Sequence, residues 1–297
     1  MTRAALLSTC GDPFILGLCI KLWKERWGSE VDKLYINYNN HAGVPLEAVQ
    51  ECLAKLIEDP RIVLVYHATG IGNGPPQVEL LKLVKEDLIL LLEDDFFIFE
   101  SGYDDTNFKM IEEGKTDLAG SPRGSCGKEV WDAAQKKYNL DYSGLGDRGP
   151  TWWPTGFYCK KEDLFKTDLD FGSKEYKAGE YFKEIDHTIQ ETEYSDTFAW
   201  ASLQLRHLGV KSVDIPQYHA SPEEIEYYEQ KSDKWKEGTW IGWIHGGSLS
   251  AGWGGYLSGR LPDVSTIQAK MEIETRVAFW TIALDTTSGF DSFKIDY

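Results

Sequence analysis

The first hundred residues alternate between short apolar segments and longer segments with helical periodicity. Four apolar segments are expected to be strands: AALLSTC (4–10), KLYINY (33–38), RIVLVY (61–66) and LILLL (88–92). The segments between them are expected to be helices: 13–28, 45–59 and 75–85. Continuous apolar strands separated by helices are typical of a parallel sheet that is covered on both faces. The alternation therefore predicts an α/β protein.

Ligands of such sheets bind at the carboxyl ends of the strands, so the residues after each expected strand are candidate site residues. After the fourth strand come three consecutive acids, Glu93, Asp94 and Asp95, which the apolar run FFIF follows directly. Carboxylates between apolar segments are costly unless they are paired or bind a ligand. We interpret the triplet as hard oxygen ligands for Mg²⁺ or Mn²⁺, ions that share their coordination with substrate phosphates.

The charge of the chain narrows the class of partner. Its formal net charge is -17, which disfavours binding to nucleic acid. A phosphorylated substrate would be repelled by the same field, and a divalent cation is the simplest way to offset that repulsion.

The cysteines indicate a reducing compartment, and the apolar runs indicate a chain without a membrane span. The five cysteines are scattered, with no CxxC pair, which argues against a disulfide framework or a structural zinc site. MTRAALLSTCGD is interrupted too early for a secretory signal, and no apolar run approaches the roughly 20 residues that span a bilayer. We expect a soluble cytoplasmic protein without an integral membrane segment; its oligomeric state is not predicted.

GIGNGP (70–75) resembles the layout of a dinucleotide fingerprint, because it follows a strand and opens a helix. The third glycine position is Pro75, where close packing of helix on strand favours Gly or Ala. An NAD-type dinucleotide-binding enzyme therefore stays only as an alternative.

The second half of the chain is less regular. We expect a helix over 196–209, a strand over 211–219 and one more helix over about 263–284. The segment 240–259 is rich in Gly, Ser and Trp and is expected to be a loop with little regular structure.

The order strand–STCGD, strand–NYNN, DPRIVLVYHATGIGNGPP and LILLLEDDFF resembles the nucleotide-sugar half of GT-A-type glycosyltransferases, particularly the inverting family 2. The resemblance covers residues 4–100 and resumes around 151–220. It implies a GT-A, Rossmann-like fold with a mixed, mostly parallel sheet flanked by helices. The donor would be a UDP- or GDP-sugar with Mn²⁺ or Mg²⁺, and the acceptor a glycan or another hydroxyl compound.

The same resemblance implies a domain organisation. Residues 1–260 would form a single domain, with the nucleotide-sugar half at 1–100 and the acceptor and catalytic half at 101–260. Residues 261–297 would be a C-terminal helix and tail.

Roles for the donor-site residues also follow from the resemblance. Glu93 or Asp94 would hold the ribose, and Asp95 would bind the metal. The nucleobase pocket would be lined by Thr9, Cys10 and Asn37 or Asn39. The family often has an aspartate at the end of the second strand, where this chain has asparagines, so the base preference stays open.

ETEYSDTFAWASLQLRHLGVKSVDIPQYH (191–219) is similar to the segment that carries the catalytic base in this family. The usual Glu-Asp pair is Ser195-Asp196 here, so Asp196 would be the general base that deprotonates the acceptor hydroxyl. Read from the residues alone, Ser-Asp before an apolar helix is also an N-cap signature.

Two further groups complete the candidate site. The family often adds a histidine to the metal shell, for which His219 and His245 are candidates. His245 lies in a Gly-rich loop that could close over a diphosphate with backbone N–H groups. TWWPTG (151–156) is the candidate acceptor segment, through Trp152, Trp153, Thr155 and Gly156, although tryptophans are as often used for core packing.

Other functions fit the sequence less well. A sugar nucleotidylyltransferase would show a G-x-G-T-R loop after the first strand, and STCGDPF lacks it. A glycoside hydrolase needs carboxylates across a cleft, which an adjacent triplet does not supply. A non-catalytic module that binds sugars or nucleotide sugars stays open, with the acids holding structural Ca²⁺.

Overall fold

The fold was obtained as a computed structural model. It describes residues 1–9, 13–40, 46–72, 74–94, 96–98, 103–122, 126–142, 149–215 and 243–245. The helix expected over 263–284 and the tail lie outside the described residues.

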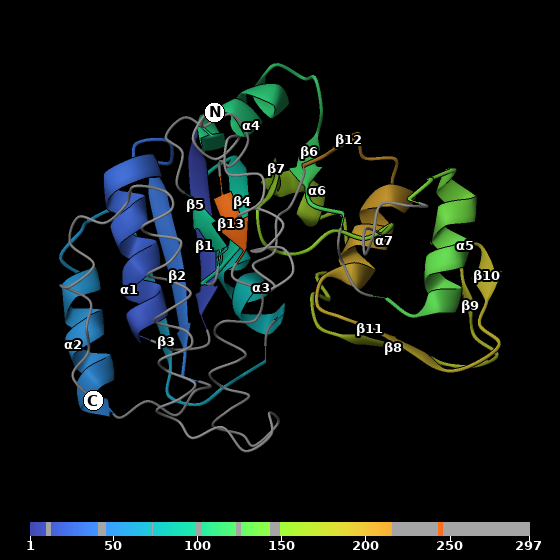
Figure 1. Ribbon diagram of the computed structural model, residues 1–297, viewed down its shortest axis with the longest axis horizontal. Helices are drawn as coiled ribbons and strands as arrows, with labels where there is room; N and C mark the ends of the chain where they lie inside the picture. Colours follow the sequence, from blue (N-terminus) through green and yellow to red (C-terminus); the bar gives the residue numbers. More distant parts are fainter. Residues whose placement is uncertain are drawn as a thin grey trace, which may run out of the picture.

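A seven-stranded sheet in the order β12-β6-β7-β4-β1-β2-β3 forms the centre of the molecule (Figure 1). Its strands are β1 (Arg3–Thr9), β2 (Lys33–Asn39), β3 (Ile62–His67), β4 (Leu88–Glu93), β6 (Leu118–Gly120), β7 (Phe157–Lys160) and β12 (Ser212–Asp214). All neighbours pair in parallel except β7, which is antiparallel to β4 and to β6. The predicted fold class, a mixed and mostly parallel sheet flanked by helices, is confirmed.

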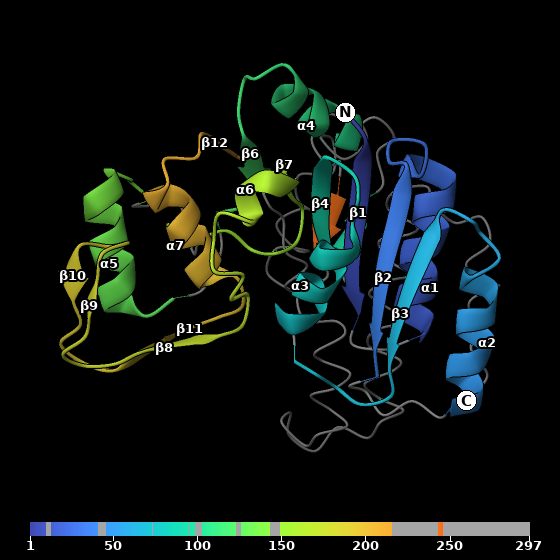
Figure 2. The same cartoon turned by 180° about the vertical axis from the view of Figure 1, so that it is seen from behind.

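Helices cover both faces of this sheet. Those of the first hundred residues are α1 (Pro13–Leu22), its π-helical continuation η1 (Trp23–Trp27), α2 (Leu46–Leu56) and α3 (Gly74–Leu83). α1 and α2 lie on one face and α3 on the other, as the two opposite views show (Figures 1 and 2). The predicted strands and helices of this half are confirmed to within a few residues, apart from the π-helical turn that ends the first helix.

The remaining elements build the second half of the molecule. The helices are α4 (Tyr103–Glu112), α5 (Lys128–Tyr138), α6 (Lys161–Leu164) and α7 (Ala199–His207). Three antiparallel pairs join β5 (Phe96–Ile98) to β13 (Trp243–His245), β8 (Lys174–Tyr176) to β11 (Glu193–Ser195), and β9 (Tyr181–Phe182) to β10 (His187–Thr188). Of the segment 240–259, where little regular structure is expected, the structure describes only β13, whose pairing partner, β5, lies far away in the sequence.

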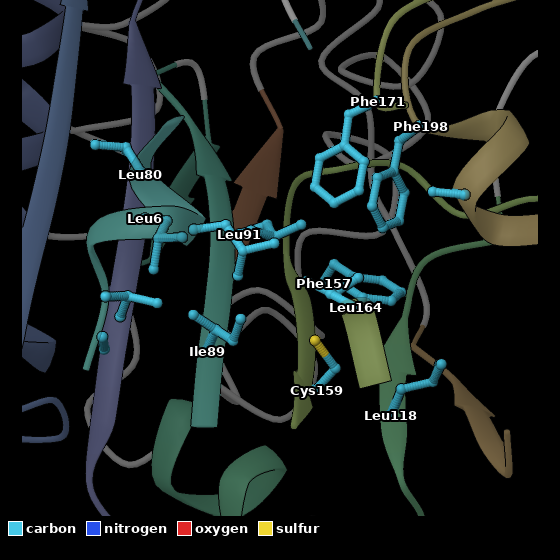
Figure 3. Close-up of a cluster of buried hydrophobic side chains, with 14 of the residues drawn as sticks. Leu6, Leu80, Ile89, Leu91, Leu118, Phe157, Cys159, Leu164, Phe171 and Phe198 are labelled. Atoms are coloured by element: carbon cyan, nitrogen blue, oxygen red, sulfur yellow. The ribbon is translucent and has the colours of Figure 1, made fainter. Parts of the chain in front are cut away.

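The main core lies between the sheet and α3 and extends to α7. Leu6 and Leu91 pack there with Leu80 of α3 and with aromatic rings from β7 and the chain before α7. Figure 3 shows Phe171 and Phe198 beyond Leu91 in the direction in which β4 runs. The core therefore reaches the carboxyl edge of the sheet, and it connects that edge to the start of α7.

A second apolar cluster holds α5 against the two β-ribbons and α7, through Val130, Tyr176, Ile185 and Trp200. We call residues 126–138 and 174–195 the α5 lobe. The carboxylate of Glu193 accepts hydrogen bonds from the backbone N–H groups of Glu129 (2.9 Å) and Val130 (3.0 Å) at the start of α5. Glu129 in turn accepts one from the backbone N–H of Gln190 (2.8 Å). These reciprocal bonds satisfy helix-terminal donors and fix the ribbons to the helix.

A buried carboxyl lies at the opposite, amino-terminal edge of the sheet. Asp104 of α4 is fully buried and accepts a hydrogen bond from the Tyr158 hydroxyl; among the described residues, its Oδ2 atom has no hydrogen-bond partner. Burial raises the pKa of Asp104 from 3.8 to about 8, with a smaller contribution from Glu30. Between these two pH values the folded state keeps a proton that the unfolded state has lost, so stability falls as the pH rises through this window.

We therefore expect Asp104→Asn to remove this pH dependence. The amide has the shape of the protonated acid, so the variant should match the wild type near pH 4 and exceed its unfolding free energy by a few kcal/mol at pH 8. Urea unfolding between pH 4 and pH 8 measures the difference. Asp105→Asn is the matched control. Hydrogen bonds to Lys109 and Arg3 lower the pKa of Asp105, so that variant should instead lose stability at neutral pH. Parallel pH profiles for wild type and Asp104→Asn would contradict the prediction.

Candidate functional site

β1 and β4 are neighbours at the point where the connections of the sheet change direction. The chain leaves β1 toward β2 and β3 on one side and returns to β4 on the other, so the loops after β1 and β4 diverge. Thr9 ends β1, and Asp94 follows β4. The Thr9 hydroxyl donates to Asp94 Oδ2 at 2.5 Å, and Asp94 is only 1% exposed. A buried carboxylate therefore bridges the two strand ends at the switch point.

Glu93 and Asp94 serve different faces of the sheet. Leu91, two residues before Glu93, packs on the α3 side, and strand alternation places Glu93 on that side as well. Asp94 lies on the α1 side, where the Cys19 thiol of α1 donates to its carbonyl oxygen at 2.7 Å. Glu93 is half-buried, and its backbone N–H donates to Thr155 Oγ1 at 3.1 Å. The resemblance offered either Glu93 or Asp94 as the residue that holds the ribose. Because the two side chains lie on different faces of the sheet, they are not interchangeable in that role.

Several of the predicted site residues are not among the residues that the structure describes. Cys10, Asp95 and His219 lie outside the described residues, and only the backbone of His245 is described. His245 pairs with Phe96 in the β13–β5 ladder, which brings its backbone beside the residue that follows the acidic triplet. Among the described residues, no group of three or more His, Cys, Asp or Glu side chains is placed to hold a metal.

The asparagines at the end of β2 are engaged by the protein itself. Asn39 donates through Nδ2 to the carbonyl of Gly72 at 3.1 Å and accepts through Oδ1 from the N–H of Ile71 at 2.9 Å. Asn37 is fully buried and donates to Glu79 Oε2 at 2.7 Å, an oxygen that also lies 2.6 Å from His67 Nε2. Asn39 thus fixes the loop that leads into α3.

The glycine loop of the dinucleotide alternative is used for packing between parts of the chain. A Cβ atom on Gly74 would lie 2.3 Å from the carbonyl carbon and oxygen of Phe171 and 2.5 Å from the nitrogen of Gly172. The start of α3 therefore touches the backbone of the segment that leads to α7. Gly74 is not one of the glycine positions of the fingerprint, which fall on Gly70, Gly72 and Pro75, so Pro75 remains the departure that disfavours the NAD-type alternative.

We expect Gly74→Ala to destabilise the protein by about 1–3 kcal/mol or more, because backbone atoms must move to admit the methyl group. Chemical denaturation measures the loss. Gly172→Ala is the control, since a Cβ there would meet only Asp170 Oδ1 at 3.5 Å, an ordinary contact. Its effect should stay within about 0.5 kcal/mol. Equal stability of the two variants would refute the tight approach at Gly74.

Asp196 is exposed and lies between β11 and α7. The N-cap of α7 is Phe198, with no side-chain cap, so the N-cap interpretation of Ser195-Asp196 is wrong. Asp196 Oδ1 instead accepts from the backbone N–H of Thr197 at 2.7 Å. The reason is the backbone at Phe198, whose φ of 67° breaks the chain direction before the helix can begin.

That left-handed conformation is strained for a bulky residue, by about 1–3 kcal/mol, and packing maintains it. The Phe198 ring makes edge contacts with Phe157 and with Phe171, each with centroids 4.9 Å apart. The Phe198 N–H donates to the Phe171 carbonyl at 2.9 Å. Because Phe171 also touches Gly74, the turn that presents Asp196 is fixed against the start of α3.

The predicted acceptor segment divides into two parts. Trp152 is fully buried, and the Arg206 guanidinium stacks on its ring at 3.9 Å. The indole Nε1 of Trp152 donates to Asp214 Oδ1 at 3.3 Å. It therefore packs in the core, while Trp153 is half-buried. Thr155 and Gly156 lie beside the acidic triplet. Thr155 accepts the Glu93 N–H, and a Cβ on Gly156 would lie 2.7 Å from the Phe96 ring.

Comparisons with known proteins bear on the fold. Neither a family model nor a curated protein matches the sequence. S. aureus TarS 1-349 is similar in structure, with a TM-score of 0.43 and 11% identity over 100% of this chain and 75% of that one. The mannosyltransferase PcManGT from Pyrobaculum calidifontis, solved with GDP-Man and Mn²⁺, gives 0.47 and 8% over 96% and 73%. TarS 1-349 in complex with UDP gives 0.42 and 13% over 100% and 76%.

These neighbours are glycosyltransferases. Among the described residues, no helix is both long and apolar enough to cross a membrane.

Proposed function

We propose that this chain is a metal-dependent glycosyltransferase that moves a sugar from a nucleoside-diphosphate sugar to a hydroxyl acceptor, with inversion at the anomeric carbon. The observation that carries the proposal is the buried carboxylate of Asp94, which Thr9 holds across the switch point in the middle of an acidic triplet. This is the edge of the sheet at which α/β proteins bind nucleotides.

The residues at this edge fit a divalent cation by their chemistry. Glu93, Asp94 and Asp95 offer carboxylate oxygens, the ligands that Mg²⁺ and Mn²⁺ prefer, with His245 as a further candidate through the position of its strand beside Phe96. When bound, the ion would neutralise the diphosphate and stabilise it as a leaving group. A chain with a net charge of -17 needs such an offset to bind a diphosphate.

In the proposed reaction, Asp196 accepts the proton of the acceptor hydroxyl. The acceptor oxygen forms a bond to the anomeric carbon, the bond from that carbon to the diphosphate oxygen breaks, and the nucleoside diphosphate leaves with the electron pair. The exposure of Asp196 and its strained, packed turn support this role, since a general base must reach the substrate from a fixed position.

The preferred nucleobase stays open between uracil and guanine. The side chain of Asn39 is bonded at both ends to residues 71 and 72, so it contributes to a base pocket by shaping that loop. Asn37 is buried and donates a hydrogen bond to Glu79, so it supports the pocket through Glu79.

A thermal-shift screen of UDP- and GDP-sugars with and without Mn²⁺ tests the proposal. A ligand that binds the native state raises its apparent stability, so at least one donor should raise the melting temperature only when Mn²⁺ is present. Slow release of the nucleoside diphosphate from that donor would show catalysis and would exclude a non-catalytic sugar-binding module. If no nucleotide sugar stabilises the protein in Mn²⁺, the proposed function is wrong.

A further inference from the structure

The β8–β11 ribbon has one buried and one exposed face. Its register pairs Tyr176 with Glu193, Glu175 with Tyr194, and Lys174 with Ser195. Tyr176 and Ser195 are buried, and their hydroxyl groups lie 3.4 Å apart. The other face therefore presents the cross-strand pair of Tyr194 and Glu175 to solvent.

Tyr194 is unusually accessible for an aromatic residue at the centre of a strand pair. Its side chain is 65% exposed, yet its hydroxyl donates to Glu175 Oε1 at 2.9 Å. This bond holds the tip of the ring, while most of the residue remains exposed. A rigid aromatic face of this kind binds ligands at a low cost in conformational entropy.

The position of this pair relates it to the proposed base. Asp196 follows Tyr194 by two residues, and the residue between them is buried while both of them are exposed. Because Asp196 directly follows the last residue of β11, the two exposed residues are at most about 7 Å apart along the chain. In both views, the ribbon lies at the height of the carboxyl ends of β1 and β2, on the side of the sheet where α5 and α7 lie (Figures 1 and 2).

Helices α5 and α7 hold the ribbon in place. Glu193, next to Tyr194, accepts both N–H groups at the start of α5, and Lys174 lies over the Trp200 ring at 4.4 Å. Trp152, the aromatic residue first expected at the acceptor site, is buried in the core and offers no face to a ligand.

We infer that the exposed face of β8–β11 is the acceptor subsite, in which Tyr194 stacks on a neutral pyranose ring and Glu175 accepts a hydrogen bond from a sugar hydroxyl. A pyranose has an apolar C–H face that matches an aromatic ring and peripheral hydroxyls that match a carboxylate. The carboxylates of Glu175 and Asp196 repel an anionic acceptor, and Lys177, 3.9 Å from Glu175, offsets only one of them. The inference rests on the proposed function, for which it names the acceptor class.

Saturation-transfer NMR with methyl pyranosides of glucose, galactose, mannose and N-acetylglucosamine tests the subsite. At least one pyranoside should bind the wild type, and Tyr194→Ala should weaken its binding about tenfold, or about 1.4 kcal/mol. Tyr194→Phe keeps the ring and should lose less. Tyr181→Ala is the matched control, because Tyr181 is 60% exposed and donates to Asp186 at 2.7 Å on the other ribbon of the lobe.

The inference is overturned if no pyranoside binds, if Tyr194→Ala binds as the wild type does, or if Tyr181→Ala loses binding equally. The melting shift with nucleotide sugar and Mn²⁺, measured on the same variants, should be unchanged by Tyr194→Ala. If a pyranoside binds through Tyr194 but no nucleotide sugar binds, the sugar subsite is supported and the proposed glycosyltransferase function is wrong. If a nucleotide sugar binds but no pyranoside does, the proposed function is supported and the subsite is wrong.

Discussion

Asp196→Asn is expected to lower the rate of sugar transfer by about 10²–10⁴-fold while leaving donor binding intact. The amide cannot accept the proton of the acceptor hydroxyl at neutral pH, although it fills the same space. Both hydrogen bonds described for the Asp196 side chain come from the adjacent Thr197, one from its N–H and one from its hydroxyl, so the substitution leaves the core and the acidic triplet unchanged. The substitution should therefore lower the rate of the transfer step without changing donor affinity or stability.

The measurement is transfer from the donor found in the nucleotide-sugar screen, followed by release of nucleoside diphosphate in the presence of acceptor. Asp186→Asn is the matched control. Asp186 is also in the second half of the chain and has a φ of 51°, a conformation that asparagine tolerates well. That variant should transfer at the wild-type rate. Wild-type transfer by Asp196→Asn would mean that another group accepts the proton or that the enzyme is retaining.

Asp95→Ala is expected to remove the Mn²⁺-dependent part of donor binding. Substitution of residues that only support a metal ligand costs about 10–100-fold, so loss of a direct ligand should cost at least that much. The prediction follows from the position of the triplet at the end of β4, beside the switch point. Isothermal titration of the donor with Mn²⁺ and with EDTA measures it.

Two companion variants sharpen this experiment. Asp94→Ala removes the bridge to Thr9 from a buried position, so it should lower the unfolding free energy as well as donor affinity. Glu58→Ala removes one negative charge from an exposed turn between α2 and β3 and should change neither. Unchanged Mn²⁺-dependent affinity in Asp95→Ala would exclude that residue as a metal ligand.

The strands and helices of the first half were predictable because they depend on local patterns. Continuous apolar runs such as 88–92 form buried strands whatever their neighbours are, and the parallel sheet follows from their alternation with helices. The position of the candidate site was also a matter of local sequence. The rule that ligands bind at carboxyl ends required only the end of each strand, and it led to Thr9 and Asp94, whose side chains the structure brings together.

Other features depended on contacts between distant segments. β13 (Trp243–His245) is defined by its pairing with β5. Its three residues are too few to be predicted as a strand from their sequence alone. The Ser-Asp cap signature before α7 was overridden at Phe198, where Phe157 and Phe171 stabilise a backbone conformation that no local rule would assign to phenylalanine. Packing energy from three separate segments outweighs a single capping bond.

The sequence by itself determined the α/β class, the order of the first strands and the place of the acidic triplet, because apolar continuity and strand ends are properties of neighbouring residues. Only the tertiary structure decided which aromatic side chains remain accessible. Trp152 was buried by Arg206 and the core, whereas Tyr194 was left on an open ribbon face beside Asp196. Exposure is set by what packs against a residue from elsewhere in the chain, so the local sequence around an aromatic residue does not decide whether a ligand can reach it.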